Sequence, residues 1–341
     1  MRERKRGRKR EEERRREAKQ RRKLENKKLS SLLKKKTPRP FKVHVGATLH
    51  WHGLSMKGSD AWYDGVAFVH QCPLQNVKNG NRQEIKFRVV DGPGLFWYHS
   101  HTGLSSVDGI FGPLVVRPPR TLAAGSEEAA ASGLLKDIEK EFVVLFGDWY
   151  HATSGALGFA AGRPFDTRKA DAETGAYGWV DLPQSMLVNG RGVFQDCALG
   201  GPTDNSTTCS PLPVGSVPAG RNRFNAFAVP SNPGCSRTNF TVTAGKKYLF
   251  RLLNVGSLTD ASLCFGGHDA VTVVSADGSP VEPLEVKSKK PGTGLGACVE
   301  VNLAQRIGVV LEASREPGSA HWVTAAPHFR AGAPHGYAVL R

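Results

Sequence analysis

At 341 residues the chain is long enough for two domains, each with its own core. Its 38 glycines and 21 prolines accompany short, frequent apolar runs, which favours an all-β fold over a helical one. No run reaches the roughly 18 apolar residues of a transmembrane helix, so the sequence excludes a helical membrane protein.

The net charge of +16 is concentrated in residues 1–36, which hold 19 of the 47 basic and 6 of the 31 acidic residues, a local excess of +13. Such a tract cannot offset the entropy of ordering by apolar burial, so we expect a disordered or frayed helical arm. Two interpretations stay open for the arm: a solvated segment without a partner, and a nucleic-acid-binding or nuclear-localisation tract. The nearly neutral remainder is not expected to bind nucleic acid.

Two His-x-His pairs follow the arm: His50 with His52, and His99 with His101. A strand predicted over residues 41–49 leads into the first pair. Because a strand has a period of two, the imidazoles of a pair point to one face, and two pairs can converge. Four neutral imidazoles suit copper or zinc, whereas magnesium and calcium need oxygen ligands. A lone histidine is more often a core residue, but two pairs favour a metal site.

The remaining pattern separates two β domains. Alternating residues from 84 to 90 predict a half-buried strand, and Leu114–Val116 predicts the last strand of the first domain. A buried strand within residues 141–150 opens the second domain, and residues 286–297 are predicted to form a loop. The expected organisation is a disordered basic arm (1–36), a first domain (37–119), a linker (120–140) and a second domain (141–341).

Four motifs resemble, in order, the first domain of multicopper oxidases, the family of laccases, ascorbate oxidases and ferroxidases. They are Leu49–Leu54 (LHWHGL), Tyr63–Val66 (YDGV), Gln71–Pro73 (QCP) and Gly94–His101 (GLFWYHSH). Met186–Gly192 (MLVNGRG) resembles a turn of the family's second domain. The resemblance implies tandem cupredoxin-like Greek-key β-sandwiches, the first without its opening strands and therefore with an exposed sheet edge, and a third domain missing from this sequence.

In the resembled enzymes a type 1 copper takes electrons from a phenolic or similar donor, and a trinuclear copper cluster reduces O2 to water. The resemblance assigns His50 to the type 2 copper, and His52, His99 and His101 to the type 3 pair. These are half of the cluster's ligands. The H-C-H and H-P-x-H-x-H motifs of the type 1 site do not occur here. We therefore expect an incomplete, catalytically silent form, or a copper-binding protein completed by a second chain.

Asp64 matches the acidic residue that the family places beside the cluster as a proton relay. An ordinary Asp-Gly turn is the alternative. Trp51 and Trp97 are expected to alternate away from the ligands and to pack the core. Cys264 and His268 are expected to have structural roles in the second domain.

The six cysteines are an even number. In the resembled family the partner of Cys72 lies in the third domain, so we expect an unpaired thiol here. Cys197 and Cys209 match a short disulfide that follows the N-G-R-G turn. The sequence leaves open the pairing of the other three, Cys235, Cys264 and Cys298.

Two N-glycosylation sequons, at Asn205 and Asn239, fit a secreted protein. Residues 1–36 contain no apolar core of a secretory signal. We therefore expect an extracellular body, preceded by a truncated or wrongly joined N-terminus.

Overall fold

The computed structural model describes residues 46–74, 83–117, 135, 137–150, 183–192, 237–289, 291, 294–314, 316, 318–329 and 333–341. The expectations for the basic arm, for most of the linker, for the Cys197–Cys209 bridge and for the Asn205 sequon lie outside these residues. Within the described segments, no helix has the length and apolar character needed to cross a membrane.

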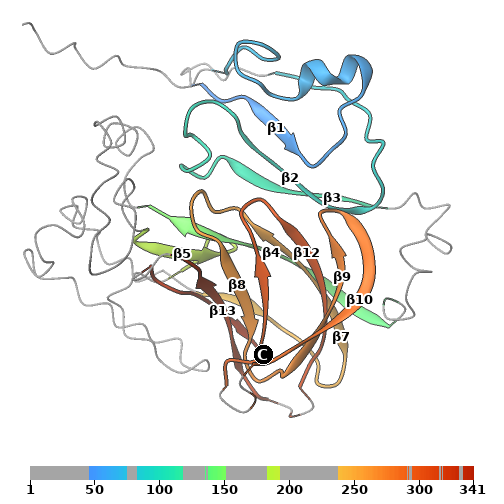
Figure 1. Cartoon of the computed structure of the whole chain (residues 1–341), viewed down its shortest axis with the longest axis vertical. Coiled ribbons are helices and arrows are strands. Elements are labelled where there is room, and N and C mark those ends of the chain that lie inside the picture. Colours follow the sequence, from blue (N-terminus) through green and yellow to red (C-terminus); the bar gives the residue numbers. More distant parts are fainter. Residues whose placement is uncertain are drawn as a thin grey trace, which may run out of the picture. The chain divides into compact units, whose positions relative to one another are not determined.

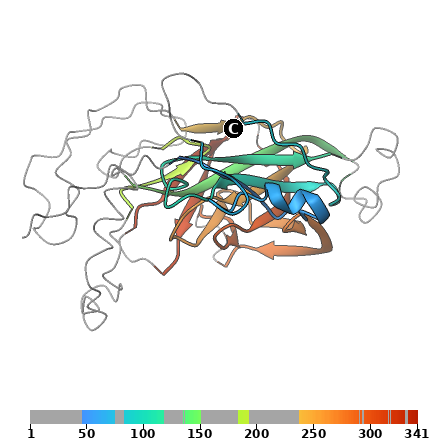
Figure 2. The ribbon, with the colours of Figure 1, turned by 90° about the horizontal axis from the view of Figure 1, so that it is seen from above.

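The first sheet has three antiparallel strands in the order β1-β2-β3 (Figure 1): β1 (Leu49–His52), β2 (Gly94–Ser100) and β3 (Phe111–Val116). The short 3-10 helix η1 (Gly58–Tyr63) follows β1 in the chain (Figure 2, blue). β2 is central and contributes the buried side chains of Leu95, Phe96 and Trp97. Among the strands that the structure describes, β1 pairs only with β2, so the first histidine pair stands on a strand with one described ladder partner.

The strand predicted over residues 84–90 is wrong. Ile85 and Phe87 are half-buried between exposed neighbours, as the alternation predicts, but the segment joins no ladder. The backbone N–H of Arg88 is instead donated to a carboxylate oxygen of Asp60 at 3.1 Å. The pattern predicted that Ile85 and Phe87 are partly covered, but Val89 on the same face is 41% exposed, and no described strand pairs with the segment.

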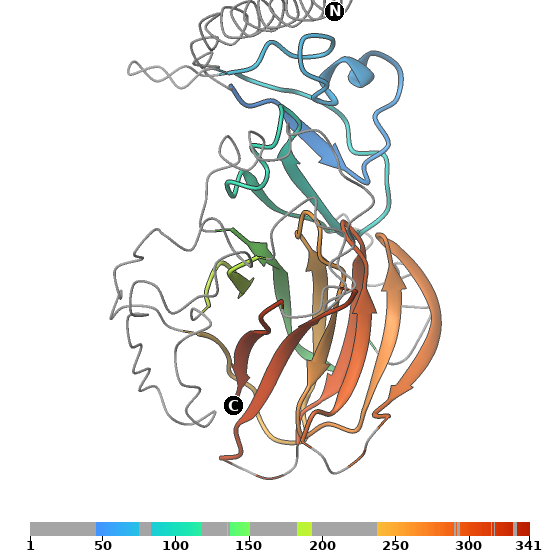
Figure 3. The same cartoon turned by 60° about the vertical axis from the view of Figure 1, so that its left-hand side comes forward.

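The larger part of the described chain contains a six-stranded sheet, β10-β9-β12-β7-β4-β5, and a five-stranded sheet, β11-β8-β13-β14-β6 (Figures 1 and 3). Their strands are β4 (Ile138–Trp149), β5 (Ser185–Val188), β6 (Thr238–Phe240), β7 (Lys247–Asn254), β8 (Ala261–Phe265), β9 (Ala270–Ala276), β10 (Ser279–Lys287), β11 (Ala297–Val301), β12 (Arg306–Glu312), β13 (His321–Pro327) and β14 (Gly336–Leu340). The predicted all-β class is confirmed. The predicted loop over 286–297 is shorter, because β10 extends to Lys287 and β11 begins at Ala297.

The main core of this larger part is mostly aliphatic and contains a cluster of aromatic rings. Phe250 on β7 is fully buried, and its ring centroid lies 5.5 Å from Phe240 and 5.2 Å from Phe265 in edge-to-face contacts. At one side of this core Cys264 on β8 forms a disulfide with Cys298, its ladder partner on β11. The structure thus resolves a pairing that the sequence left open, while Cys72 is free, as expected.

The first sheet packs on the six-stranded sheet. Leu95 and Trp97 of β2 form one buried cluster with Leu253 of β7, and Val143 and Leu145 of β4 border it. The strand β2, which carries His99, therefore shares a core with the larger part of the chain.

Candidate metal centre

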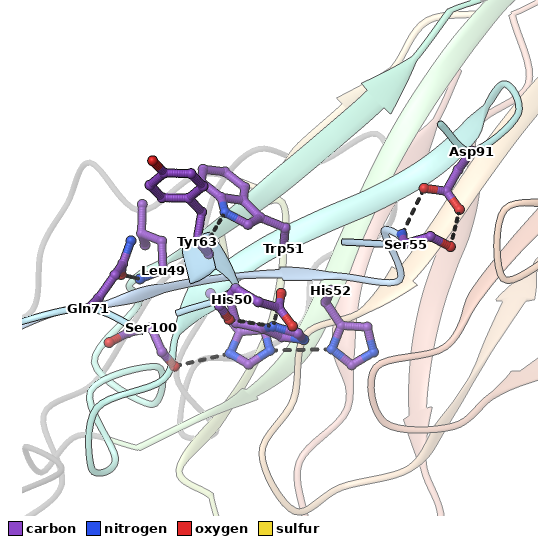
Figure 4. A network of polar contacts seen from close by, with 11 residues as sticks. Leu49, His50, Trp51, His52, Ser55, Tyr63, Gln71, Asp91 and Ser100 are labelled. Carbon is purple, nitrogen blue, oxygen red and sulfur yellow. Dashed lines mark hydrogen bonds and ion pairs between the residues drawn. The ribbon is translucent and has the colours of Figure 1, made fainter. Parts of the chain in front are cut away.

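The four predicted ligands come from β1 and β2 and their ends. The ladder places His50 directly opposite His99. His50 and His52 point to the same side of β1, whereas Trp51 points to the other side (Figure 4). One ring nitrogen from each of His50, His52 and His99 lies within 4.8 Å of the other two. The period of two thus brings the histidine pairs together, as predicted.

His101 lies one residue beyond β2, at the exposed rim of this group. Its ring centroid is 5.4 Å from that of His50 and 6.0 Å from that of His99, outside the tighter three-residue group. Its backbone N–H donates to the carbonyl oxygen of Thr48. Thr48 in turn donates its backbone N–H to the hydroxyl of Thr102 at 3.1 Å, and both threonines are buried. The chain around His101 is therefore anchored, although the ring is exposed.

The hydrogen bonds of the rings determine which nitrogens can bind a metal. Nδ1 of His50 lies 2.9 Å from a carboxylate oxygen of Asp64, and Nδ1 of His99 lies 3.0 Å from the carbonyl oxygen of Ser100. Both acceptors require a proton on Nδ1, which leaves the Nε2 lone pair available. Nδ1 of His52 faces Nε2 of His99 at 3.3 Å (Figure 4). A metal ion could replace this contact between the rings.

The local environment favours neutral imidazoles. Burial, followed by the charges of Arg306, His50 and His99, lowers the pKa of His52 to about 4. Burial also lowers the pKa of His99, against a smaller opposing effect of the hydrogen bond to Ser100. Neutral imidazole is the form that binds metal. His52 and His99 are therefore in the metal-binding form near pH 7. A group of nitrogen donors without a carboxylate ligand fits copper or zinc.

Asp64 is placed by the glycine that follows it. Gly65 has φ +85°, and a Cβ there would lie 2.2 Å from the carbonyl oxygen of Leu49, so only glycine allows this turn to approach β1 so closely. The carboxylate of Asp64, whose side chain is 29% exposed, then meets the His50 ring. Such a partner fixes the tautomer and orientation of a metal-binding imidazole. Asp64 thus stands in an Asp-Gly turn and also contacts a proposed metal ligand.

The prediction that Trp97 alternates away from the ligands is wrong. Its ring centroid lies 4.4 Å from that of His99 and 5.0 Å from that of His52. Trp97 precedes His99 by two residues, so the strand period places both on the same face. Trp97 is nevertheless buried in a core cluster, as expected. Trp51 does alternate away and packs on Phe87, with 4.8 Å between ring centroids.

Sequence reasoning missed Arg306. This residue begins β12, yet a Cβ on Gly53 would lie 2.3 Å from its Nη2 atom. The guanidinium therefore reaches the residue that directly follows His52. No motif or period signals this contact, because it joins segments about 250 residues apart in the chain.

His268 has the structural role that was expected. Its Nδ1 donates to the carbonyl oxygen of Gly266 at 2.8 Å, and its Nε2 accepts the backbone N–H of Ser314 at 3.0 Å. Burial lowers the pKa of His268, which keeps the ring neutral. Both nitrogens of His268 are thus used in hydrogen bonds. Cys264 is bonded to Cys298 and offers no free thiol to a metal.

Comparisons with known proteins all match this chain to multicopper oxidases. Two family models, each described as multicopper oxidase, match residues 42–121 and 140–341. Laccase-5 of Trametes villosa is 30% identical over 82% of this chain and 39% of its own length. L-ascorbate oxidase of Cucurbita pepo var. melopepo is 25% identical over 83% of this chain and 42% of its own length.

Among solved structures, the laccase of Botrytis aclada aligns with a TM-score of 0.57 at 25% identity, over 87% of this chain and 43% of that one. Fet3p, described as a multicopper oxidase that functions in iron import, aligns with a TM-score of 0.55 at 20% identity, over 86% and 42% of the two chains. These alignments confirm the expected cupredoxin-like fold. The chain spans about two fifths of the length of these relatives.

Proposed function

Because the chain belongs to the multicopper oxidase family, we propose that it binds copper through His50, His52, His99 and His101 and serves laccase-type oxidation. The reaction would oxidise phenolic or similar donors and reduce O2 to water. The observation that carries this proposal is the convergence of one ring nitrogen from each of His50, His52 and His99 within 4.8 Å. Bound copper would supply the redox chemistry.

We assign His50 to a type 2 copper, and His52, His99 and His101 to a type 3 pair. The exposed ring of His101 supports an open rim at which further ligands could join. These four histidines are half of a trinuclear ligand set, so the other half would come from a second chain or a further segment. The alternative is a copper-binding protein without turnover.

The other residues around the site have supporting roles in this proposal. Asp64 holds the proton on Nδ1 of His50, and its partly exposed carboxylate can exchange protons with solvent, as a proton relay must. Trp97 covers the rings of His52 and His99 on one side and excludes water there. Both roles use contacts that exist without a bound metal.

The proposed organisation is a cupredoxin-like first domain over residues 37–119 and a second over 141–341. The two family matches, over residues 42–121 and 140–341, support a division at the linker 120–140. The separate three-stranded sheet and the two-sheet sandwich support the same division. In this arrangement the first domain supplies all four proposed copper ligands.

We also propose that the protein is an extracellular glycoprotein. The disulfide between Cys264 and Cys298 fits an oxidising compartment. Asn239 of the second sequon is exposed on β6, whereas its neighbour Phe240 is buried. Treatment of secreted protein with an endoglycosidase should therefore reduce its mass, and an Asn239→Gln variant should lack the glycan at this position.

Copper content of the full chain tests the main proposal. We expect the purified protein to load copper and the double variant His52→Ala/His99→Ala to lose it, because two members of the three-residue group are removed. His335→Ala, which changes a histidine outside the site, should load normally. Equal loading of all three proteins would refute the site. Turnover of a phenolic dye is expected only when a partner supplies the missing ligands.

A further inference from the structure

Arg306 occupies a buried position between the first sheet and the sandwich, with 6% of its surface exposed. Its Nε donates to the carbonyl oxygen of Leu95 on β2 at 3.2 Å. Its Nη2 donates to the carbonyl oxygen of Asp277 at 3.1 Å, and its Nη1 donates to that of Ala304 at 3.3 Å. The carboxylate of Asp277 completes the set with an ion pair at 3.0 Å. One side chain thus joins β2 to two turns of the sandwich.

The same guanidinium lies behind the first histidine pair. Gly53 follows His52 directly, has φ +87° and leaves room for Nη2, which would lie 2.3 Å from a Cβ at this position. On the β2 side, the guanidinium carbon lies 5.8 Å from the ring centroid of Phe96. Arg306 therefore contacts the chain immediately after His52 and three to four residues before His99.

The backbones also approach closely at this junction. A Cβ on Gly94, the first residue of β2, would lie 2.6 Å from the carbonyl oxygen of Gly278, in the turn between β9 and β10. A Cβ on Gly278 would lie 2.8 Å from the ring of Phe96. With no side chain between them, the start of β2 rests directly on the turn that Arg306 holds through Asp277.

We propose that Arg306 is a positioning residue for the histidine cluster: it ties the sandwich to the ends of β1 and β2 and so sets the spacing of His52 and His99. This inference rests on the proposed copper site and deepens it. It gives the second domain, which supplies none of the four ligands, a defined part in metal binding. The guanidinium suits this task because its planar donors reach several acceptors at once.

A purely electrostatic role for Arg306 would have the opposite consequence. A positive charge near a cation site opposes metal binding, so removing it would strengthen copper affinity. The ion pair with Asp277 makes the local pair formally neutral, which weakens this effect. Loss of a residue that orients metal ligands typically weakens metal affinity about 10- to 100-fold. The direction of the change therefore separates the two roles.

The test compares full-length wild type with Arg306→Met, Arg306→Lys and Arg251→Met. Arg251 is the matched control, because it is also 6% exposed and ion-paired, but to Glu141. Copper affinity is measured by competition with a chelator, and the signal is normalised to folded protein. Electron paramagnetic resonance of the bound Cu(II) reports the ligand geometry, and amide hydrogen exchange at Gly53 and Leu54 reports the tether in the metal-free protein.

We expect Arg306→Met to weaken copper affinity at least tenfold, to alter the resonance spectrum and to speed exchange at Gly53 and Leu54. Arg306→Lys should recover part of each loss, and Arg251→Met should lower the thermal midpoint without changing copper affinity. Unchanged or stronger copper binding by Arg306→Met, with unchanged exchange, would overturn the inference. If wild type itself binds no copper, the proposed function fails, and the exchange data still decide whether Arg306 holds the strand.

Discussion

Asp64→Asn is the substitution that most directly tests how the protein prepares the copper site. The carboxylate oxygen of Asp64 lies 2.9 Å from Nδ1 of His50. The asparagine side chain is nearly the same size and keeps an acceptor oxygen, but it loses the charge. The imidazole of His50 would then be a weaker electron donor through Nε2, and its orientation would be held less firmly. We therefore expect weaker copper binding without a change of fold.

The expected size of this loss follows from a second contact. The backbone carbonyl oxygen of Asp64 also lies 3.0 Å from Nδ1 of His50, and this acceptor survives the substitution. Changes to the partners of metal-binding histidines typically cost 10- to 100-fold in affinity. Because the backbone acceptor is unchanged and the asparagine amide oxygen can still accept, only the charge is lost, so we expect the lower end, about tenfold, or about 1.4 kcal/mol.

The assay is a Cu(II) competition titration of wild type, Asp64→Asn and Asp91→Asn. Asp91 is the control, because its carboxylate also serves the first sheet but accepts the backbone N–H and hydroxyl of Ser55, at 2.8 and 2.7 Å, and bonds to no histidine (Figure 4). Asp91→Asn should keep wild-type copper affinity. Equal losses in both variants, or none in Asp64→Asn, would refute the orienting role of Asp64.

Three further predictions concern stability. Phe250→Ala should cost about 3–5 kcal/mol in urea unfolding, because the ring is fully buried; a loss below about 1 kcal/mol would contradict this packing. The double variant Cys264→Ser/Cys298→Ser should lose about 3–4 kcal/mol, since the disulfide spans 34 residues; a loss below about 1 kcal/mol would contradict this contribution. The lowered pKa of His268 implies that its contribution to stability is complete above about pH 6.5 and is lost as the pH falls from there toward the folded-state pKa. His268→Gln should therefore flatten the decrease in thermal midpoint between pH 7 and pH 5, and an unchanged slope would exclude this role.

The histidine cluster was predictable because its information is local. The spacing of His50 from His52, and of His99 from His101, places each pair on one face of a strand. Pairing of the two strands then brings the two histidine pairs to the same face of the sheet. The same parity also places Trp97 beside His99. The prediction that Trp97 points away from the ligands assumed that a core residue cannot also contact them. The indole ring of Trp97 is both buried and in contact with the rings of His52 and His99.

Contacts between distant segments were beyond the reach of sequence reasoning. The disulfide of Cys264 depends on the ladder register of β8 and β11, which no spacing rule predicts. The alternation around Phe87 predicted a covered face, but hydrogen-bond partners depend on which strand lies alongside. The approach of Arg306 to Gly53 requires the complete packing of the first sheet on the sandwich.

The histidine-bearing strand β1 is held mainly from its sides. It has one described ladder partner, and additional contacts come from side chains: the amide oxygen of Gln71 accepts the backbone N–H of Leu49 at 3.0 Å, and the hydroxyl of Thr102 accepts that of Thr48. Asp64 adds a contact to His50 at the middle of the strand. Because none of these contacts uses the nitrogens proposed to bind copper, the strand can hold its shape before metal arrives. Copper binding then requires little reorganisation of the chain, so less of the binding free energy is lost. The contacts made by Gln71, Thr102 and Asp64 therefore favour metal binding by a strand that has few ladder bonds.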